Sequence, residues 1–125
     1  MPIDASQPYD DTNIFARILR SEVPCKRVLE TEHSLAFADI APLRPTHVLV
    51  IPKAAYVSWD DFSAKGSDAE LADFVRVLGQ VARDAGLAAD GYRLIANTGM
   101  HGGQEVPHLH VHVLGGASLG AMLTR

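Results

Sequence analysis

The histidines at positions 108, 110 and 112 alternate strictly with aliphatic residues, and this stretch restricts the possible folds more than any other. Residues two apart in a β-strand point to the same side of the sheet. The segment 108–114 is therefore predicted to be a strand with two different faces. One face carries His108, His110 and His112, and the other carries Leu109, Val111 and Val113. The aliphatic face should be buried in a core, and the imidazole face is available for chemistry.

Two stretches have helical periodicity. The segment 67–85 begins with Ser67, has Glu70 three residues later as in a capping box, and is followed by the helix-ending Gly86. The segment 11–21 places apolar residues on one face, and we expect Asp11 or Thr12 to be its N-cap. The sequence therefore predicts two helices.

Five segments are rich in β-branched or aromatic residues or alternate in polarity, and we expect strands at 26–30, 34–40, 47–53, 92–97 and 108–114. Two of the connections between them are short enough for antiparallel neighbours. The predicted fold is α+β: a single domain with a mainly antiparallel sheet of about five strands. The helix at 67–85 should cover one face, with the helix at 11–21 nearby.

Composition restricts the functional classes. The chain has 125 residues, enough for one compact domain, and 11 Lys and Arg against 15 Asp and Glu, which argues against nonspecific nucleic-acid binding. No apolar run approaches the ~18 residues of a membrane span, and the polar start does not resemble a secretory signal, so we expect a cytoplasmic protein. Residues 1–10 are expected to be a disordered N-terminal segment and residues 11–125 the folded domain.

The imidazole face has two chemical interpretations. A metal site would need three nitrogens at ~2.1 Å from one ion, whereas the outer positions of one straight strand are ~13 Å apart, and Cys25 is the lone cysteine. We therefore expect neither metal nor cofactor. An anionic substrate fits better, because neutral imidazole is a nucleophile near pH 7. The preceding glycine-rich loop, after Asn97, can bring backbone N–H groups to a phosphate.

The stretch "HLHVHVL" resembles the signature of the histidine triad (HIT) superfamily, in which three histidines alternate with hydrophobic residues. The resemblance extends over "DTNIFARILRSEVP", "LAFADIAPLRPTHVLVIPK", "GYRLIANTG" and "GGQEVPHLHVHVLGG", and it is strongest for the bacterial-type Hint branch, which hydrolyses purine nucleoside phosphoramidates. The resemblance implies a HIT domain over 11–125 and a homodimer. It also implies hydrolysis to the nucleoside monophosphate through a nucleotidyl-histidine intermediate.

The resemblance also implies roles for individual residues. His110 is the nucleophile, His112 contacts the phosphate, His108 supports the nucleophile, and His47 is a further active-site histidine. The phosphate site corresponds to Asn97, Gly103, Gln104, Glu105 and the backbone of Val106. The nucleoside pocket corresponds to Ile14, Phe15, Ile18, Val23, Phe37, Asp39 and Ile40. Asp39 is expected to bind the ribose hydroxyls.

Two alternatives remain open at this point: a dinucleoside polyphosphate hydrolase of the Fhit branch, and a nucleotide-binding regulatory protein with little turnover. Three positions depart from the family pattern. Glu105 stands where animal relatives have a serine, Ala55 where many relatives have a histidine, and Ala117 where arginine is common. Related acyl-nucleotides, such as aminoacyl adenylates, are also expected substrates.

Overall fold

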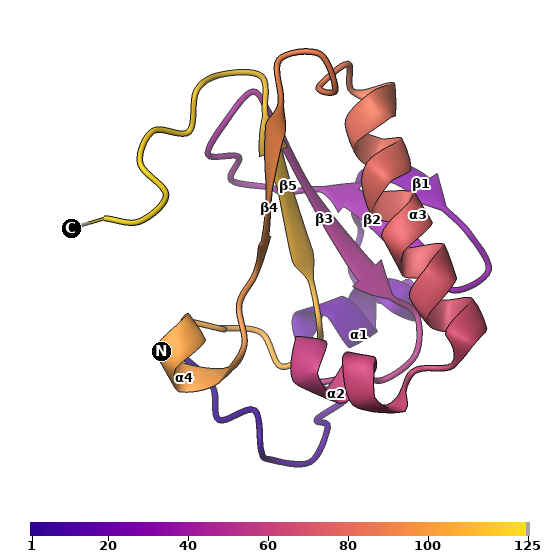
Figure 1. Cartoon of the computed structure of the whole chain (residues 1–125). Coiled ribbons are helices and arrows are strands. Elements are labelled where there is room, and N and C mark those ends of the chain that lie inside the picture. The colour runs from indigo at the N-terminus through magenta and orange to yellow at the C-terminus, as the bar shows by residue number, and fades with distance from the viewer. Residues whose placement is uncertain (125) are drawn as a thin grey trace.

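A computed structural model describes residues 1–124 and contains one antiparallel sheet in the order β1-β2-β3-β5-β4 (Figure 1). The strands are β1 (Arg27–Glu30), β2 (Ser34–Ala38), β3 (Thr46–Pro52), β4 (Tyr92–Ala96) and β5 (Val111–Gly115). The predicted α+β fold with five antiparallel strands is confirmed. β5 lies between β3 and β4, so it is an interior strand of the sheet.

One face of the sheet is covered by α3 (Asp68–Asp84), which crosses it as a long diagonal helix in Figure 1. The predicted capping box is confirmed: the Ser67 hydroxyl accepts the Glu70 N–H at 3.1 Å, and the Glu70 carboxylate accepts the Ser67 N–H at 3.0 Å. Leu109, Val111 and Val113 are almost completely buried in the core beneath this helix. The prediction that the aliphatic side of this segment is packed is also confirmed.

The opposite face carries α1 (Ile14–Leu19), whose residues Phe15 and Ile18 pack against Leu35, Phe37, Leu49 and Ile51 of β2 and β3. The N-cap of this helix is Asn13, whose side chain accepts the Ala16 N–H at 2.9 Å, so the expected caps Asp11 and Thr12 are wrong. The N–H and hydroxyl of Thr12 instead both donate to the Asp10 carboxylate, in the turn before the helix.

The structure has two short helices that the sequence analysis did not predict, α2 (Trp59–Lys65) and α4 (Gly99–Gly102). With seven and four residues respectively, they are too short for apolar periodicity to be visible. Within residues 1–124, no helix has the length and apolar character needed to cross a membrane.

Strand β5 begins at Val111, so the expected strand over 108–114 starts three residues too early. The antiparallel ladder with β3 ends where Val50 pairs with Val111. Beyond it, Pro52 has no N–H to donate, its carbonyl is bonded to the His108 ring, and the Leu109 N–H donates to Tyr56. Two of the three histidines therefore precede the strand, and only His112 lies in it.

The segment 1–10, for which the sequence analysis predicts disorder, lies along the domain between α4 and α1 (Figure 1). The Ile3 N–H donates to the Gln104 carbonyl at 2.7 Å, and the Tyr9 hydroxyl lies 2.6 Å from the His108 ring. We call residues 1–10 the N-terminal strap. It reaches the buried side of the histidine cluster.

Candidate active site

A cavity of about 300 Å³ lies on the α1 face of the sheet, where the ends of several elements meet. Its walls are Phe15, Asp39, Leu49, Asn97, Gly103, Glu105, Val106, His110 and His112. They come from α1, the end of β2, β3, the segment after β4, the loop after α4, and β5 with the segment before it. Gly103 ends α4 with φ of 73°, and this left-handed turn directs the loop 103–106 along the cavity wall.

His110 is nine-tenths buried, and its Nδ1 lies 2.8 Å from the backbone carbonyl oxygen of His108. A carbonyl only accepts hydrogen bonds, so the ring proton must be on Nδ1. The other ring nitrogen, Nε2, therefore carries an unshared electron pair. The Phe15 ring meets the imidazole edge-on, with centroids 4.9 Å apart, and fixes its plane. This is the arrangement that a nucleophilic imidazole requires.

His108 is completely buried and does not line the cavity. Its Nε2 lies 2.8 Å from the Pro52 carbonyl oxygen, so Nε2 carries the proton and Nδ1 is an acceptor. The Tyr9 hydroxyl donates to this Nδ1 over 2.6 Å. His108 thus contacts His110 through its backbone carbonyl, which agrees with a supporting role.

His47 and His112 form a hydrogen-bonded pair. The Leu43 N–H donates to Nδ1 of His47 at 3.1 Å, so the proton of His47 is on Nε2. This Nε2–H donates to Nδ1 of His112 at 2.9 Å, and the proton of His112 is consequently on its own Nε2. His112 lines the cavity, and within residues 1–124 its Nε2–H has no protein acceptor. It is available to donate to an anionic ligand.

Burial keeps the three triad histidines uncharged. Burial lowers the pKa of His108 to about 4, and the neighbouring His110 acts in the same direction. Burial also lowers the pKa of His112 to about 4, and here both His110 and His47 act in the same direction. The pKa of His110 is also lowered, chiefly by burial, although its hydrogen bond to the His108 carbonyl and the charge of Asp39 oppose the shift. At neutral pH the cavity therefore contains neutral imidazole.

Asp39, His47 and His112 are the described residues closest to a metal-binding arrangement, with one ligand atom of each within 4.8 Å of the others. An ion here would need an electron pair on Nε2 of His47. That nitrogen carries a proton, and moving the proton to Nδ1 would direct it at the Leu43 N–H. The backbone therefore favours the hydrogen-bonded pair, and the residues do not fit a metal well.

The structure brings together part of the predicted nucleotide site. Six of the twelve predicted residues line the cavity: Phe15, Asp39, Asn97, Gly103, Glu105 and Val106. The Asn97 amide donates to the Gly102 carbonyl at 2.6 Å and holds the loop. Asp39 accepts the Ala41 N–H at 2.8 Å and lies 3.4 Å from Nε2 of His47.

The other six predicted residues are not among those that line this cavity. Ile18 and Phe37 are in the core under α1 and Val23 packs against it, while Ile14 is 39% exposed and Ile40 is 97% exposed. Gln104 is completely buried: its amide donates to the Val57 and Val106 carbonyls and accepts the Gly99 N–H. Its side chain fastens the loop from behind and does not line the cavity.

Sequence reasoning missed two residues of the site. Leu49 lines the cavity, and alternation along β3 could have found it, because it follows His47 by two positions and shares its face. Tyr9 contacts His108 from 99 positions away, and no sequence pattern indicated this contact.

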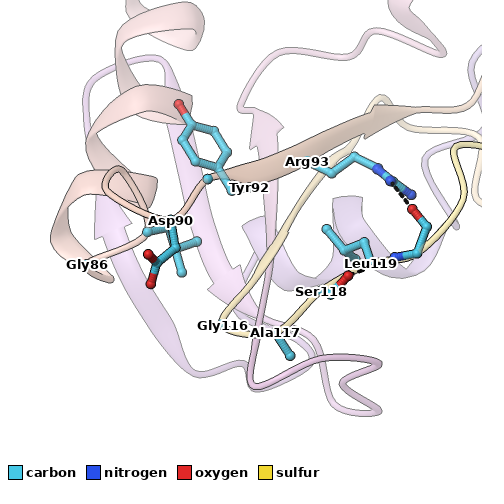
Figure 2. Close-up of a pocket in the computed structure, with 11 residues that line it drawn as sticks. Gly86, Asp90, Tyr92, Arg93, Gly116, Ala117, Ser118 and Leu119 are labelled. Carbon is cyan, nitrogen blue, oxygen red and sulfur yellow. Dashed lines mark hydrogen bonds between the residues drawn. The ribbon is translucent and has the colours of Figure 1, made fainter.

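A larger hollow of about 640 Å³ lies at the opposite end of β4 and β5, beside the C-terminal segment (Figure 2). The Arg93 guanidinium donates there to the Gly120 and Ala121 carbonyls at 3.2 and 3.3 Å. Its walls contain no histidine or cysteine, and the charge of Arg93 is directed at the C-terminal segment. This hollow therefore lacks an imidazole or thiol nucleophile, and the histidine cluster is the better candidate site.

The five-stranded sheet and the histidine cluster define the class of protein. The HIT domain family matches residues 20–119, and the chain belongs to this family. It is 59% identical over 120 residues to an uncharacterized HIT-like protein of Azospirillum brasilense, covering 96% of this chain and 98% of that one. It is 45% identical over 113 residues to a purine nucleoside phosphoramidase of Escherichia coli K12, covering 90% and 94% of the two chains.

Solved structures agree with the sequence comparison. A HIT family hydrolase from Clostridium thermocellum has a TM-score of 0.82 at 38% identity, over 92% of this chain and 99% of that one. A histidine triad protein from Clostridium difficile has a TM-score of 0.80 at 37% identity, over 91% and 98%. The predicted membership of the HIT family is confirmed.

Proposed function

We propose that this protein is a purine nucleoside phosphoramidase, which hydrolyses the bond between the phosphorus of a nucleoside 5'-phosphate and an amine nitrogen. The observation that carries the proposal is the free electron pair on Nε2 of His110, in a neutral ring at the wall of a cavity with polar donors. The 45% identity to the phosphoramidase of Escherichia coli supports this choice of substrate.

The reaction proceeds in two displacements. Nε2 of His110 attacks phosphorus, the phosphorus–nitrogen bond of the substrate breaks, and the departing amine takes up one proton. Water then attacks the phosphorus of the nucleotidyl-histidine, the phosphorus–Nε2 bond breaks, and the water releases one proton as the nucleoside monophosphate forms. The Nε2–H of His112 donates to a phosphate oxygen in both steps. Asp39, at the same wall, accepts hydrogen bonds from the ribose hydroxyls.

Replacement of His110 by alanine tests the proposal. The change removes the nucleophile and leaves Asp39, His112 and the loop 103–106 to hold the nucleotide. Turnover of adenosine phosphoramidate should fall by several orders of magnitude while the Kd for AMP changes less than about tenfold, a gap of more than ~3 kcal/mol between chemistry and binding. His101→Ala, which removes an exposed histidine of α4, is the matched control and should keep full turnover.

Mass spectrometry of a quenched reaction should find the nucleotidyl group on His110. An adduct on His108 or His112, or more than about a tenth of the turnover left in His110→Ala, would contradict the assigned roles. The same assay with diadenosine polyphosphate distinguishes the Fhit-like alternative. A protein that binds AMP but turns over neither substrate would be a nucleotide-binding regulator.

We also propose a homodimer through the edge strand β4. This strand has an unpaired edge with Tyr92 and Leu94 more than 40% exposed, beside an apolar hollow of about 350 Å³ that includes Trp59 and Leu78. Exposed strand edges and apolar patches are typical of association surfaces. Light scattering at micromolar concentration should give twice the mass of one chain, and a monomer mass would contradict the proposal.

A further inference from the structure

We infer that Tyr9 of the N-terminal strap is a positioning residue for catalysis, which holds His108 and through it the nucleophile His110. The inference rests on the proposed function, because it concerns the rate of the His110 reaction. Tyr9 lies outside the segment 20–119 that matches the HIT family. It therefore adds a contribution to the site from outside the matched segment, as Phe15 of α1 also does.

Two hydrogen bonds through His108 connect Tyr9 to the nucleophile, and a third anchors the His108 ring. The Tyr9 hydroxyl donates to Nδ1 of His108 at 2.6 Å, and Nε2 of His108 donates to the Pro52 carbonyl at 2.8 Å. The His108 backbone carbonyl then accepts the Nδ1–H of His110 at 2.8 Å. The two bonds to the ring fix both its rotation and its tautomer. Because the ring and the carbonyl belong to one residue, these two hydrogen bonds also restrict the position of the His108 carbonyl, which orients His110.

The surroundings of Tyr9 suit a permanent donor. Its ring is half-buried and meets the His108 ring edge-on, with centroids 5.6 Å apart. Burial raises the pKa of the Tyr9 hydroxyl, so it stays protonated at neutral pH. Within residues 1–124 no buried side-chain nitrogen or oxygen lacks a hydrogen-bond partner. Loss of the Tyr9 hydroxyl would leave Nδ1 of His108 as a buried acceptor without a donor.

Packing alone does not explain the strap. A hollow of about 770 Å³ separates residues 5–9 from α2 and the segment before it, so this part of the strap is not embedded in the core. Asp10 accepts local hydrogen bonds from Thr12 and Asn13. The two longer-range hydrogen bonds of the strap within residues 1–124 join the Ile3 backbone to Gln104 and Tyr9 to His108. The second of these ends on the triad itself.

Tyr9→Phe is the test, because it keeps the ring and removes only the hydroxyl. We expect the kcat for adenosine phosphoramidate to fall about tenfold, which corresponds to ~1.4 kcal/mol of activation free energy. The KM and the Kd for AMP should stay within about twofold, because Tyr9 does not line the cavity. Ring ¹⁵N NMR without substrate should show His108 protonated on Nε2 in both proteins, because the Pro52 carbonyl remains its acceptor. The Nδ1 resonance should shift in the variant, because Nδ1 loses the Tyr9 hydroxyl as its hydrogen-bond donor.

Two control variants separate positioning from stability. Thr31→Val removes another half-buried hydroxyl, which donates to Asp73 at 2.7 Å and is not bonded to a triad histidine. Gln7→Ala removes an exposed amide of the strap. Thr31→Val should lower the unfolding temperature about as much as Tyr9→Phe but keep the kcat, and Gln7→Ala should change neither.

The outcomes are distinct. Equal losses of kcat in Tyr9→Phe and Thr31→Val would overturn the positioning role and indicate a general effect of stability. An unchanged kcat in a folded Tyr9→Phe protein, or an unchanged Nδ1 resonance of His108, would also overturn it. If the unmodified protein forms no adduct and turns over no phosphoramidate, the proposed function is overturned. The expected effect of Tyr9 on the rate is then overturned as well. The NMR experiment would still decide the contact between Tyr9 and His108.

Discussion

Gln104→Ala removes the side chain that holds the loop 103–106 against the domain. In the folded protein, the Gln104 amide nitrogen donates to the Val57 carbonyl at 2.6 Å and to the Val106 carbonyl at 3.0 Å, and its oxygen accepts the Gly99 N–H at 3.0 Å. The side chain is 1% exposed, so water does not replace these partners without a rearrangement. The variant leaves three backbone groups unpaired and a small void among them.

The expected loss of stability follows from these three bonds. Each contributes roughly 0.5–1.5 kcal/mol net, so their sum is about 3 kcal/mol of unfolding free energy. For a chain of this size that corresponds to a decrease of about 10 °C in Tm. The Kd for AMP should rise only a few-fold, because the loop becomes less ordered but no ligand-contacting side chain is lost.

Calorimetry at one fixed protein concentration measures the Tm, and AMP titration measures the Kd. Gln80→Ala is the matched control: it removes an exposed glutamine that donates to Asp84 on α3, and its effect should be below about 0.5 kcal/mol. A Gln104→Ala protein with an unchanged Tm and a much weaker affinity for AMP would refute the reasoning. It would mean that the Gln104 side chain contacts the nucleotide.

Three further predictions concern the ligand, metal ions and pH. Asp39→Ala should raise the KM for ribonucleotide substrates about 10- to 100-fold, the effect of losing charge-assisted hydrogen bonds worth roughly 1.5–3 kcal/mol. The KM for a 2',3'-dideoxy substrate should be nearly unchanged by the substitution. Equal losses with both substrates would show that Asp39 has a structural role. EDTA should leave the activity intact, and loss of turnover restored by zinc would contradict this. The pKa of His108 is about 4 in the folded state against about 6.5 unfolded, so the unfolded chain binds more protons between these values and stability must decrease as the pH falls. Its contribution to this loss should be about 2–3 kcal/mol at pH 4.5, and NMR titration of the His108 ring with a midpoint near 6.5 would refute the assignment.

Local signals in the sequence predicted the elements whose stability is local. The capping box at Ser67 and Glu70 gave the start of α3, and alternation gave the buried side of the β5 segment. The start of β5 depends instead on Pro52, which lies on a different strand and ends the ladder. The N-cap of α1 depended on which of several polar side chains reaches an N–H of the first turn. Asn13 reaches Ala16, whereas Asp10 accepts from Thr12, and propensities do not distinguish these partners.

For the site too, the sequence predicted the features that depend on residue type and missed those that depend on folded neighbours. The motif and its resemblance predicted the triad and Asp39 as site residues, because these residues have chemistry that is specific to their type, and the structure places His110, His112 and Asp39 at one cavity. They did not indicate that Gln104 points away from the cavity, because the direction of a loop side chain depends on backbone partners such as Val57, 47 positions away. Nor did they give the proton positions on the imidazoles, which depend on neighbours brought together only by folding.

The hydrogen-bond partners of His47, His108 and His110 include three peptide groups: the Leu43 N–H and the Pro52 and His108 carbonyls. A peptide group does not ionise in the accessible pH range and cannot be removed by changing a side chain. The arrangement of protons on the imidazoles is thus set by main-chain geometry. Substitution of Leu43, whose side chain is exposed, should leave it intact. Alanine scanning would not detect these determinants, whereas replacing the Leu43 amide with an ester in a semisynthetic protein would expose the first of them.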